Sequence, residues 1–459
     1  MRLSSISLSL LFCSLLSATP ADLILSAGRV VTMDAQRTVI VNGAVAIAKG
    51  RILAVGPKAE IDQKYQAAKR IDRPDAILAP GLINTHTHAP MSLLRGIADD
   101  LTLQKWLEKF IFPAEAKNVN EQFVRVGTRL AVLEMMLGGT TTYVDMYYFE
   151  GAIAEETKKA GMRAVLGQTI IGFPAPDYKT PELALAGTEK FIQRFKDDAL
   201  IMPTVAPHAI YTNSPETLKA ARALADKYKT LFVIHVSETQ KENSDCGRDH
   251  NNMTPTAYLE SLGALTGRTL FAHAVWTRAN DIITIKRHNI GIAHCPSSNM
   301  KLGSGTANVM GLLRTGIAVG LGTDGPAGSN NDFDMFEEMD LASKLAKVSA
   351  QDPTVLPATQ AFAMATIGGA QALGLEKEIG SLEAGKKADL ITVSTSAPNG
   401  WPMHDVYSML VYSLKASDVQ DVVIEGKPTV ENRKALTLNP VEIRRDVKLL
   451  RDKVDASLK

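Results

Sequence analysis

Eight short apolar runs recur along the middle of the chain, and helix-like stretches such as 121–137 and 215–228 separate most of them. The runs read ILAPGLINTHTH, TTTYVDM, RAVLGQTI, LIMPTVAPH, LFVIHVSE, TLFAHAV, GIAHCP and AVGLGTDG. Strands that alternate with helices predict βαβ units and a parallel sheet. An open doubly wound sheet is the alternative, but no early strand is followed by the G-x-G-x-x-G turn of a dinucleotide site. Eight units in about 240 residues match an α/β fold of the TIM type, a (β/α)8 barrel, which we expect over residues 78–379.

Two β-rich segments flank this middle part. Residues 22–77 alternate apolar and polar positions and break at Gly and Asp turns, and the stretches GSLEAGKKADLITVS and DVQDVVIEGKPTVEN repeat this pattern near the other end. Two β-rich ends around a long middle predict one small β-sandwich domain, built from residues 22–77 and 380–435. The amphipathic, charged residues 436–459 predict a C-terminal helix.

The first 21 residues have the pattern of a secretory signal peptide. A positive charge at Arg2 precedes an apolar run from Leu3 to Leu16, and small residues follow at 18–21. This run is shorter than the ~20 residues that a membrane-spanning helix needs. We therefore expect an exported protein, periplasmic or secreted, that has no membrane partner after the signal is removed.

Charge and cysteine content exclude several classes of protein. The formal net charge is +1 and no basic stripe is present, so a nucleic-acid partner is not expected. Beyond the predicted signal only Cys246 and Cys295 remain, which is too few for a disulfide framework. No C-x-x-C motif occurs, which excludes a cysteine-ligated zinc deaminase site.

Histidines gather at the ends of the predicted strands. Six of the nine His residues lie there: His86, His88, His208, His235, His273 and His294. The eighth run ends in Asp324. The carboxyl ends of barrel strands meet at one mouth, where active sites form. The sequence therefore predicts an active site built from these side chains.

Four of these residues suit a metal ion. His86 and His88 are two apart on a strand, so both imidazoles point to the same side. His235 and Asp324 can complete a shell of three nitrogens and one carboxylate, which suits one Zn²⁺ per subunit, with Fe²⁺ or Mn²⁺ as alternatives. Considered alone, an aspartate such as Asp324 is also typical of a turn, and a histidine such as His208 is also typical of a hydrogen-bonded core position. The joint order along the strands favours the metal site.

Two further groups near this site suit proton transfer. Glu238 follows His235 by three residues and can carry protons without joining the metal shell. His273 can orient the attacking water or stabilise developing negative charge. With Asp324 as the third member, these residues form the predicted catalytic set of a metal-dependent hydrolase.

Six segments together resemble the amidohydrolase superfamily, and the similarity covers nearly the whole chain after the signal. The segments are PGLINTHTHAPMSLLRG, HVSET, AHAV, AHCPSSNMKLGSG, LGTDGPAGSNN and GSLEAGKKADL. They are similar to the branch that holds methylthioadenosine/S-adenosylhomocysteine deaminases and the related triazine hydrolases. This resemblance implies hydrolysis of C–N bonds other than peptide bonds, as in the deamination of a cyclic amidine.

The resemblance also implies roles for individual residues. His86, His88, His235 and Asp324 match the ligands of a single metal ion, and no lysine matches the bridging lysine of two-metal members. Glu238 resembles the proton shuttle, and His273 the group that polarises water. The resemblance further implies that His208 contacts the nucleoside, that Trp106 faces the base, and that Glu115 binds the ribose hydroxyls.

One position departs from the family pattern. Users of adenosylhomocysteine often carry an Arg just after the third strand, whereas Gln168 stands in this stretch and no Arg occurs from 164 to 190. Without that Arg, a substrate carboxylate loses a bidentate partner. Methylthioadenosine or adenosine is therefore expected ahead of adenosylhomocysteine, with Gln168 at the substrate.

The expected function is a zinc-dependent aminohydrolase that deaminates an adenosine-type nucleoside in salvage. The enzymatic alternative is C–N or C–Cl hydrolysis of another heterocycle, such as guanine, a pterin or a triazine. A secreted metal- or ligand-binding protein is the non-enzymatic alternative. The expected partner is a small heterocyclic substrate, and the resemblance implies a homodimer or tetramer.

Overall fold

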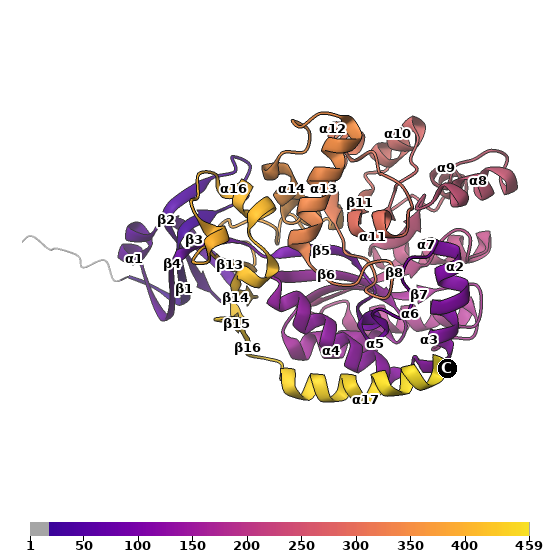
Figure 1. Cartoon of the computed structure of the whole chain (residues 1–459), viewed down its shortest axis with the longest axis horizontal. Coiled ribbons are helices and arrows are strands. Elements are labelled where there is room, and N and C mark those ends of the chain that lie inside the picture. Colours follow the sequence, from indigo (N-terminus) through magenta and orange to yellow (C-terminus); the bar gives the residue numbers. More distant parts are fainter. Residues whose placement is uncertain (1–17, 459) are drawn as a thin grey trace, which may run out of the picture.

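The computed structural model describes residues 18–458, which form a large and a small part (Figure 1). The large part contains a closed barrel of eight parallel strands, and the small part contains one mixed sheet. Around the barrel the order is β10-β11-β12-β5-β6-β7-β8-β9, so the strands follow one another along the chain and β12 closes onto β5. The predicted (β/α)8 barrel is confirmed.

Each predicted apolar run contains one strand of the barrel. The strands are β5 (Leu82–Thr87), β6 (Thr140–Tyr147), β7 (Arg163–Ile170), β8 (Ile201–Pro207), β9 (Phe232–Val236), β10 (Thr269–His273), β11 (Gly291–His294) and β12 (Val319–Leu321). All of their residues are buried except the half-buried Met202. Helices cover the outside of such a barrel and side chains fill its inside, so parallel strands are apolar on both faces.

Helices surround the barrel. They are α4 (Glu121–Leu137), α5 (Glu150–Ala160), α6 (Pro181–Phe195), α7 (Pro215–Tyr228), α8 (Gln240–Asp249), α9 (Pro255–Ser261), α10 (Ala279–Arg287), α11 (Pro296–Lys301), α12 (Val309–Arg314), α13 (Met335–Ala350), α14 (Ala358–Met364) and α15 (Ile367–Leu373). Several begin at a polar N-cap, such as Asn120 or Ser214, whose side chain accepts a backbone N–H of the first turn. The predicted helices 121–137 and 215–228 are confirmed as α4 and α7.

The connection from β5 to α4 is long and partly helical. It contains η1 (Ala89–Leu94), α2 (Leu103–Trp106), the π-helical turn η2 (Leu107–Ile111) and α3 (Phe112–Asn118). This connection, called the first loop below, starts at the carboxyl end of β5. It therefore lies at the end of the barrel where the polar strand ends meet.

The small part is built from both ends of the chain. Its strands are β1 (Thr19–Val31), β2 (Val39–Ala48), β3 (Arg51–Pro57), β4 (Tyr65–Pro80), β13 (Leu390–Ser394), β14 (Val419–Ile424), β15 (Lys427–Glu431) and β16 (Lys434–Ala435), with α1 (Lys58–Lys64) between β3 and β4. Short helical turns lie between β13 and β14: η3 (Pro398–Gly400), α16 (Val406–Ser408), η4 (Met409–Ser413) and η5 (Ala416–Asp418).

These strands form one continuous sheet in the order β16-β15-β14-β13-β4-β1-β2-β3. The N-terminal and C-terminal strands meet where β4 pairs antiparallel with β13, for example Leu78 with Thr392. The sheet buries an apolar cluster of its own, which includes Leu25, Val45 and Leu390. The prediction of a small β domain made from both termini is confirmed, but its strands form one mixed sheet rather than the two packed sheets of a sandwich. Strand β4 extends past residue 77 to Pro80 before the barrel begins.

The chain ends in the long helix α17 (Pro440–Leu458), which leaves the small domain and lies along the side of the barrel (Figure 1). It packs against α4 and α3. The Lys117 ammonium and the Asn118 amide of α3 donate to the carbonyl and hydroxyl oxygens of Ser457 over 2.9 and 2.7 Å. The C-terminal helix thereby supports the end of the first loop.

The predicted signal peptide falls mostly outside the described residues. Its last three positions, Thr19 to Ala21, belong to β1 and pair with Tyr65 to Ala67 of β4. Among residues 18–458, no helix combines the length and apolar character needed to cross a membrane. Export remains a prediction from residues 1–21.

A buried ion pair links the barrel to the small domain. Arg163 begins β7, and its Nε and Nη2 donate to both carboxylate oxygens of Asp389, which directly precedes β13, over 2.7 and 3.2 Å. A further hydrogen bond joins Arg163 to Glu425. The side chains of Arg163 and Asp389 are only 8% and 3% exposed, so little water can replace either partner.

Replacing Arg163 by Ala should lower the free energy of unfolding by about 3–5 kcal/mol, because it leaves the buried Asp389 carboxylate without its partner. Thermal and denaturant unfolding of the purified variant would measure this loss. Arg194→Ala is the matched control, since Arg194 pairs with Glu155 at an exposed position and such pairs contribute about 0–1 kcal/mol. Equal stability of the two variants would contradict a role for the Arg163 pair in joining the domains.

Candidate active site

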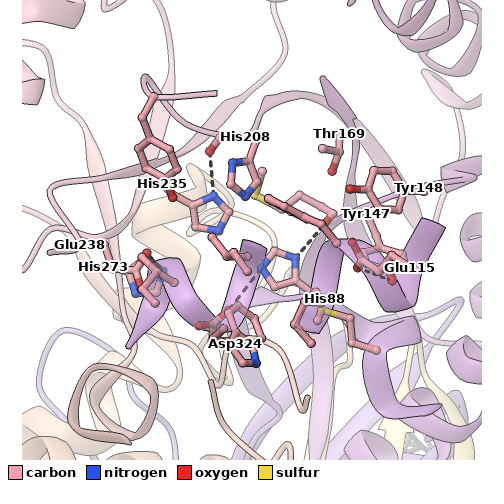
Figure 2. A pocket seen from close by; sticks show the side chains of 18 residues that line it. His88, Glu115, Tyr147, Tyr148, Thr169, His208, His235, Glu238, His273 and Asp324 are labelled. Carbon is pink, nitrogen blue, oxygen red and sulfur yellow. Dashed lines mark hydrogen bonds and ion pairs between the residues drawn. The ribbon is translucent and has the colours of Figure 1, made fainter. Parts of the chain in front are cut away.

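A pocket of about 550 Å³ opens at the carboxyl ends of the barrel strands. Its wall combines apolar and aromatic side chains of the first loop with polar groups from the strand ends. The polar groups that line it are His88, Glu115, Thr169, His208, His235, Glu238, His273 and Asp324 (Figure 2). The strand-end histidines and acids predicted to meet at one mouth are therefore together, except for His294; His86 does not line the pocket itself but lies directly against His88, His235 and Asp324.

Three imidazoles and one carboxylate gather in the floor of this pocket. One ligand atom each from His86, His88 and His235 lies within 4.8 Å of the others. Asp324 Oδ1 is 3.3 Å from both His86 Nε2 and His88 Nε2. Figure 2 shows His88, His235 and Asp324 turned toward a common space.

The donor set fits a zinc ion. Nδ1 of His88 bonds to the Met146 carbonyl and Nδ1 of His235 to the His208 carbonyl, each over 2.7 Å, so the Nε2 atoms remain for a metal. Outer hydrogen bonds of this kind are typical of metal-binding histidines. Within the described chain, neither ring nitrogen of the buried His86 makes a hydrogen bond. A cation beside His86 would compensate for that unsatisfied nitrogen.

The charges of the site also favour a cation at this place. Burial lowers the pKa of His86 to about 4, so its imidazole is neutral and able to ligate. Burial likewise lowers the pKa of His88, but contact with Asp324 outweighs this effect and raises it to about 9. Burial raises the pKa of Asp324, but His86 and His88 hold it well below its usual range. The cluster thus attracts one positive charge, which a proton or a metal ion can supply.

Glu238 and His273 lie beside this cluster. Glu238 Oε2 is 3.8 Å from His273 Nε2, and both side chains are almost completely buried. Burial, reinforced by the nearby Asp324 carboxylate, raises the pKa of Glu238 well above its usual value. Burial thus favours the protonated form of this pocket-lining carboxyl group, which is the form needed to donate a proton.

The backbone at the catalytic groups is held in unusual conformations. Ser237, His273 and Asp324 have φ angles of 53°, 71° and 64°, in the left-handed region that non-glycine residues rarely adopt. Such strain persists only where surrounding contacts enforce it. The buried Glu242 carboxylate provides one such contact, because it accepts the N–H groups of Ser237 and Glu238 over 2.9 and 2.8 Å.

Several supporting residues escaped the sequence-based prediction. Besides Glu242, Ser298 donates to Asp324 and Asn299 bonds to His273. Asp145 accepts the Thr87 hydroxyl over 2.7 Å and so supports the end of β5, between His86 and His88. Ser298 and Asn299 lie in the AHCPSSNMK segment that resembles the family, and Asp145 lies near the carboxyl end of β6, so their positions were available signals.

Trp106, Glu115 and His208, which were expected at the substrate, all line the pocket. Glu115 lines the pocket and accepts the Tyr147 hydroxyl over 2.7 Å. His208 also lines the pocket, with Nδ1 3.0 Å from the Thr212 hydroxyl. Trp106 is in the wall, but its indole N–H donates to the Ala327 carbonyl over 2.8 Å, so it also ties the first loop to the segment after β12.

Gln168 is the exception, and its predicted contact with substrate is wrong. Its side-chain amide donates to Asp177 over 2.8 Å and accepts the N–H of Glu150, away from the pocket. Successive residues of a strand face opposite sides, so the neighbouring Thr169 faces the pocket instead. The third strand was identified correctly, but the residue that faces the pocket is Thr169, one position after Gln168.

Comparisons with known proteins agree with this geometry. Residues 77–429 match the model of the Amidohydrolase family. A Thermodesulfovibrio yellowstonii protein named 5-methylthioadenosine/S-adenosylhomocysteine deaminase is 46% identical over 88% of this chain and 92% of its own. The chain belongs to the amidohydrolase family. This amidohydrolase is also 42% identical to a 5'-deoxyadenosine deaminase of Methanobrevibacter smithii over 88% of this chain and 92% of the relative.

A solved structure extends the comparison to the metal site. An adenosine deaminase from Xanthomonas campestris, described with bound zinc, superposes on this amidohydrolase with a TM-score of 0.94. The two sequences are 38% identical, and the match covers 96% of this chain and 100% of the other. The predicted family is confirmed, and the His/Asp cluster is the metal-binding site of a hydrolase.

Removing a ligand should remove the metal. His86→Ala, His88→Ala and His235→Ala should each lower bound zinc from about one equivalent to well below, because each deletes one donor of the four-donor set. Metal analysis of dialysed protein measures this. His288→Ala is the matched control, since this histidine also contacts a carboxylate, Glu260, but lies at the end of α10. Full zinc occupancy in all three variants would contradict this ligand set.

Proposed function

We propose that this amidohydrolase is a zinc-dependent deaminase of adenosine-type nucleosides that prefers methylthioadenosine and adenosine. The observation that carries the proposal is the buried Glu238 carboxyl group beside the metal-binding cluster, inside a pocket that the carboxyl group of Glu115 also lines. The names of the relatives, which are deaminases of adenosine-type compounds, support the same reaction class.

His86, His88, His235 and Asp324 would hold the zinc ion. When bound, the ion lowers the pKa of water toward ~7 and so supplies a nucleophile at neutral pH. Asp324 and His273 lie where they can accept the proton that the attacking water loses. The water oxygen forms its bond to the amine-bearing ring carbon.

Glu238 donates a proton, whereas Asp324 and His273 accept one. Its carboxyl proton passes to the ring nitrogen next to the attacked carbon, which allows that carbon to become tetrahedral. The proton held by Asp324 and His273 then reaches the amino group, and the remaining hydroxyl proton passes to the Glu238 carboxylate, so ammonia leaves, the ring carbonyl forms and the acid is restored. Burial raises the pKa of Glu238 and so favours the protonated form that this transfer needs.

The rest of the pocket suits a nucleoside. A carboxylate accepts two hydroxyl hydrogens, so Glu115 is suited to a ribose diol. Burial raises the pKa of Glu115 to about 7, and the Tyr147 hydroxyl counteracts this by donating to it. Apolar side chains of the first loop, among them Leu107 and Phe112, supply flat walls for the base and its substituents.

The pocket is poorly suited to an anionic substituent. Among residues 18–458, no lysine or arginine lines it, whereas three carboxyl groups do: Glu115, Glu238 and Asp324. A substrate carboxylate would lose its water without gaining a charged partner. The amino-acid tail of adenosylhomocysteine is therefore disfavoured relative to a methylthio group or a hydroxyl.

Glu238→Gln should lower kcat/KM for nucleoside deamination at least ~100-fold, because the amide cannot donate a carboxyl proton to the ring nitrogen. Ammonia release from zinc-loaded protein would measure the loss. Glu189→Gln, a change at a half-buried position on the outer helix α6 that does not line the pocket, is the control. A mild effect of Glu238→Gln would favour hydrolysis without a ring acid, and activity that survives chelation would contradict metal dependence.

Methylthioadenosine should exceed adenosylhomocysteine in kcat/KM by at least ~10-fold, because the pocket offers the carboxylate no cation. Thr169→Arg places a guanidinium at the pocket wall and should raise the relative activity on adenosylhomocysteine. Gln168→Arg is the matched control, since its side chain points away from the pocket. Equal activity on both nucleosides in the unmodified enzyme would contradict the preference. Guanine, a pterin and a triazine complete the substrate panel.

A further inference from the structure

Two neighbouring side chains of α11 lie directly behind the groups that accept the proton of water. Ser298 and Asn299 are 0% and 1% exposed, and neither lines the pocket. The Ser298 hydroxyl donates to Asp324 Oδ2 over 2.6 Å, and Asn299 Oδ1 lies 3.0 Å from His273 Nδ1. Any influence of this pair on substrate must therefore pass through Asp324 and His273.

The bond to Asn299 determines which nitrogen of His273 carries hydrogen. An amide oxygen only accepts, so the hydrogen between these atoms belongs to His273 Nδ1. A neutral imidazole carries one hydrogen, which leaves Nε2 as an acceptor. This Nε2 lies 3.8 Å from Oε2 of Glu238, the acid that lines the pocket.

The bond to Ser298 fixes the orientation of Asp324. With Oδ2 occupied by the Ser298 hydroxyl, Oδ1 faces His86 Nε2 and His88 Nε2, each 3.3 Å away. Rotation of the carboxylate would break the hydrogen bond and bury an unpaired hydroxyl. One oxygen of Asp324 is therefore directed toward the metal-binding cluster.

The strained backbone increases the need for these anchors. His273 and Asp324 both have left-handed φ angles, a backbone conformation that non-glycine residues adopt only where surrounding contacts hold it. Both anchors come from a single short helix that Pro296 and Cys295 start directly after β11. One structural element thus sets the directions of two groups that come from β10 and from the end of β12.

We propose that Ser298 and Asn299 are positioning residues for deamination. Asn299 fixes His273 in the tautomer with hydrogen on Nδ1, so that Nε2 takes a proton from water while the water oxygen bonds to the ring carbon. Ser298 holds Asp324 with Oδ1 toward the metal-binding cluster. The role in deamination rests on the proposed function, whereas the tautomer is a property of the free protein.

The first experiment measures steady-state kinetics of Asn299 variants on methylthioadenosine. Asn299→Leu should lower kcat about 10–100-fold with little change in KM, as is usual for the hydrogen-bond partner of an active-site histidine. Asn299→Asp keeps the acceptor oxygen, and Asn299 Nδ2 makes no hydrogen bond within the described residues, so this variant should retain most of the wild-type kcat. Unchanged kcat in a folded Asn299→Leu protein would overturn the proposal.

A matched pair on α11 tests the serine. Ser298→Ala should lower kcat about 10–100-fold at nearly constant KM, because Asp324 loses its hydrogen-bond donor. Ser297→Ala removes the adjacent hydroxyl, which has no hydrogen-bond partner among the residues described, and should leave kcat unchanged. Equal kcat in the two variants would overturn the role of Ser298.

The second experiment observes the tautomer without turnover. Ring ¹⁵N shifts of histidine-labelled, zinc-loaded protein, with His273 assigned from a His273→Gln spectrum, should show hydrogen on Nδ1 in the wild type and a mixture in Asn299→Leu. Hydrogen on Nε2 in the wild type would overturn the proposal even if every Asn299 variant failed to fold. A wild type with hydrogen on Nδ1 that deaminates no nucleoside would instead contradict the proposed function and support the tautomer assignment.

Discussion

The closure of the barrel between its first and last strands is the constraint on which the site depends. Across this seam the Asn84 amide donates to the Thr323 hydroxyl over 2.8 Å and accepts the Thr323 N–H. The N–H of Asp324 donates to the His86 carbonyl over 2.9 Å. Two residues far apart in the sequence are thus held by their backbones, before any metal binds. A parallel barrel allows this because all strand ends of one polarity meet at one rim.

Burial and neighbouring groups shift the pKa values of the two acids of the site, Asp324 and Glu238, in opposite directions. Asp324 among the imidazoles creates a place for a cation, while burial raises the pKa of Glu238 well above its usual value. Both are carboxylic acids of nearly equal burial, so their different states follow from their neighbours rather than from their type. The two different environments give the site a proton donor and a proton acceptor that act on the same substrate at neutral pH.

The sequence allowed much of the fold and site to be predicted. Continuous apolar runs identified the barrel strands because parallel strands are buried on both faces. The H-x-H spacing predicted that His86 and His88 share a side, because side chains alternate along a strand. The same alternation made Gln168 an error, since a shift of one residue moves a side chain to the opposite face. Ser298 was not recognised because its role depends on a contact with Asp324 from another strand.

By itself the sequence determined the barrel, the two-ended β domain, the family and the residue types at the strand ends, because these follow from local periodicity and short motifs. Tertiary structure alone decided which atoms face one another. Three features are of this kind: the bond between Asn299 and His273, the contact of Trp106 with Ala327, and a pocket wall that, among the described residues, holds no lysine or arginine. The physical reason is that hydrogen bonds and desolvation depend on distances of a few ångströms between distant segments, which only the packed chain fixes.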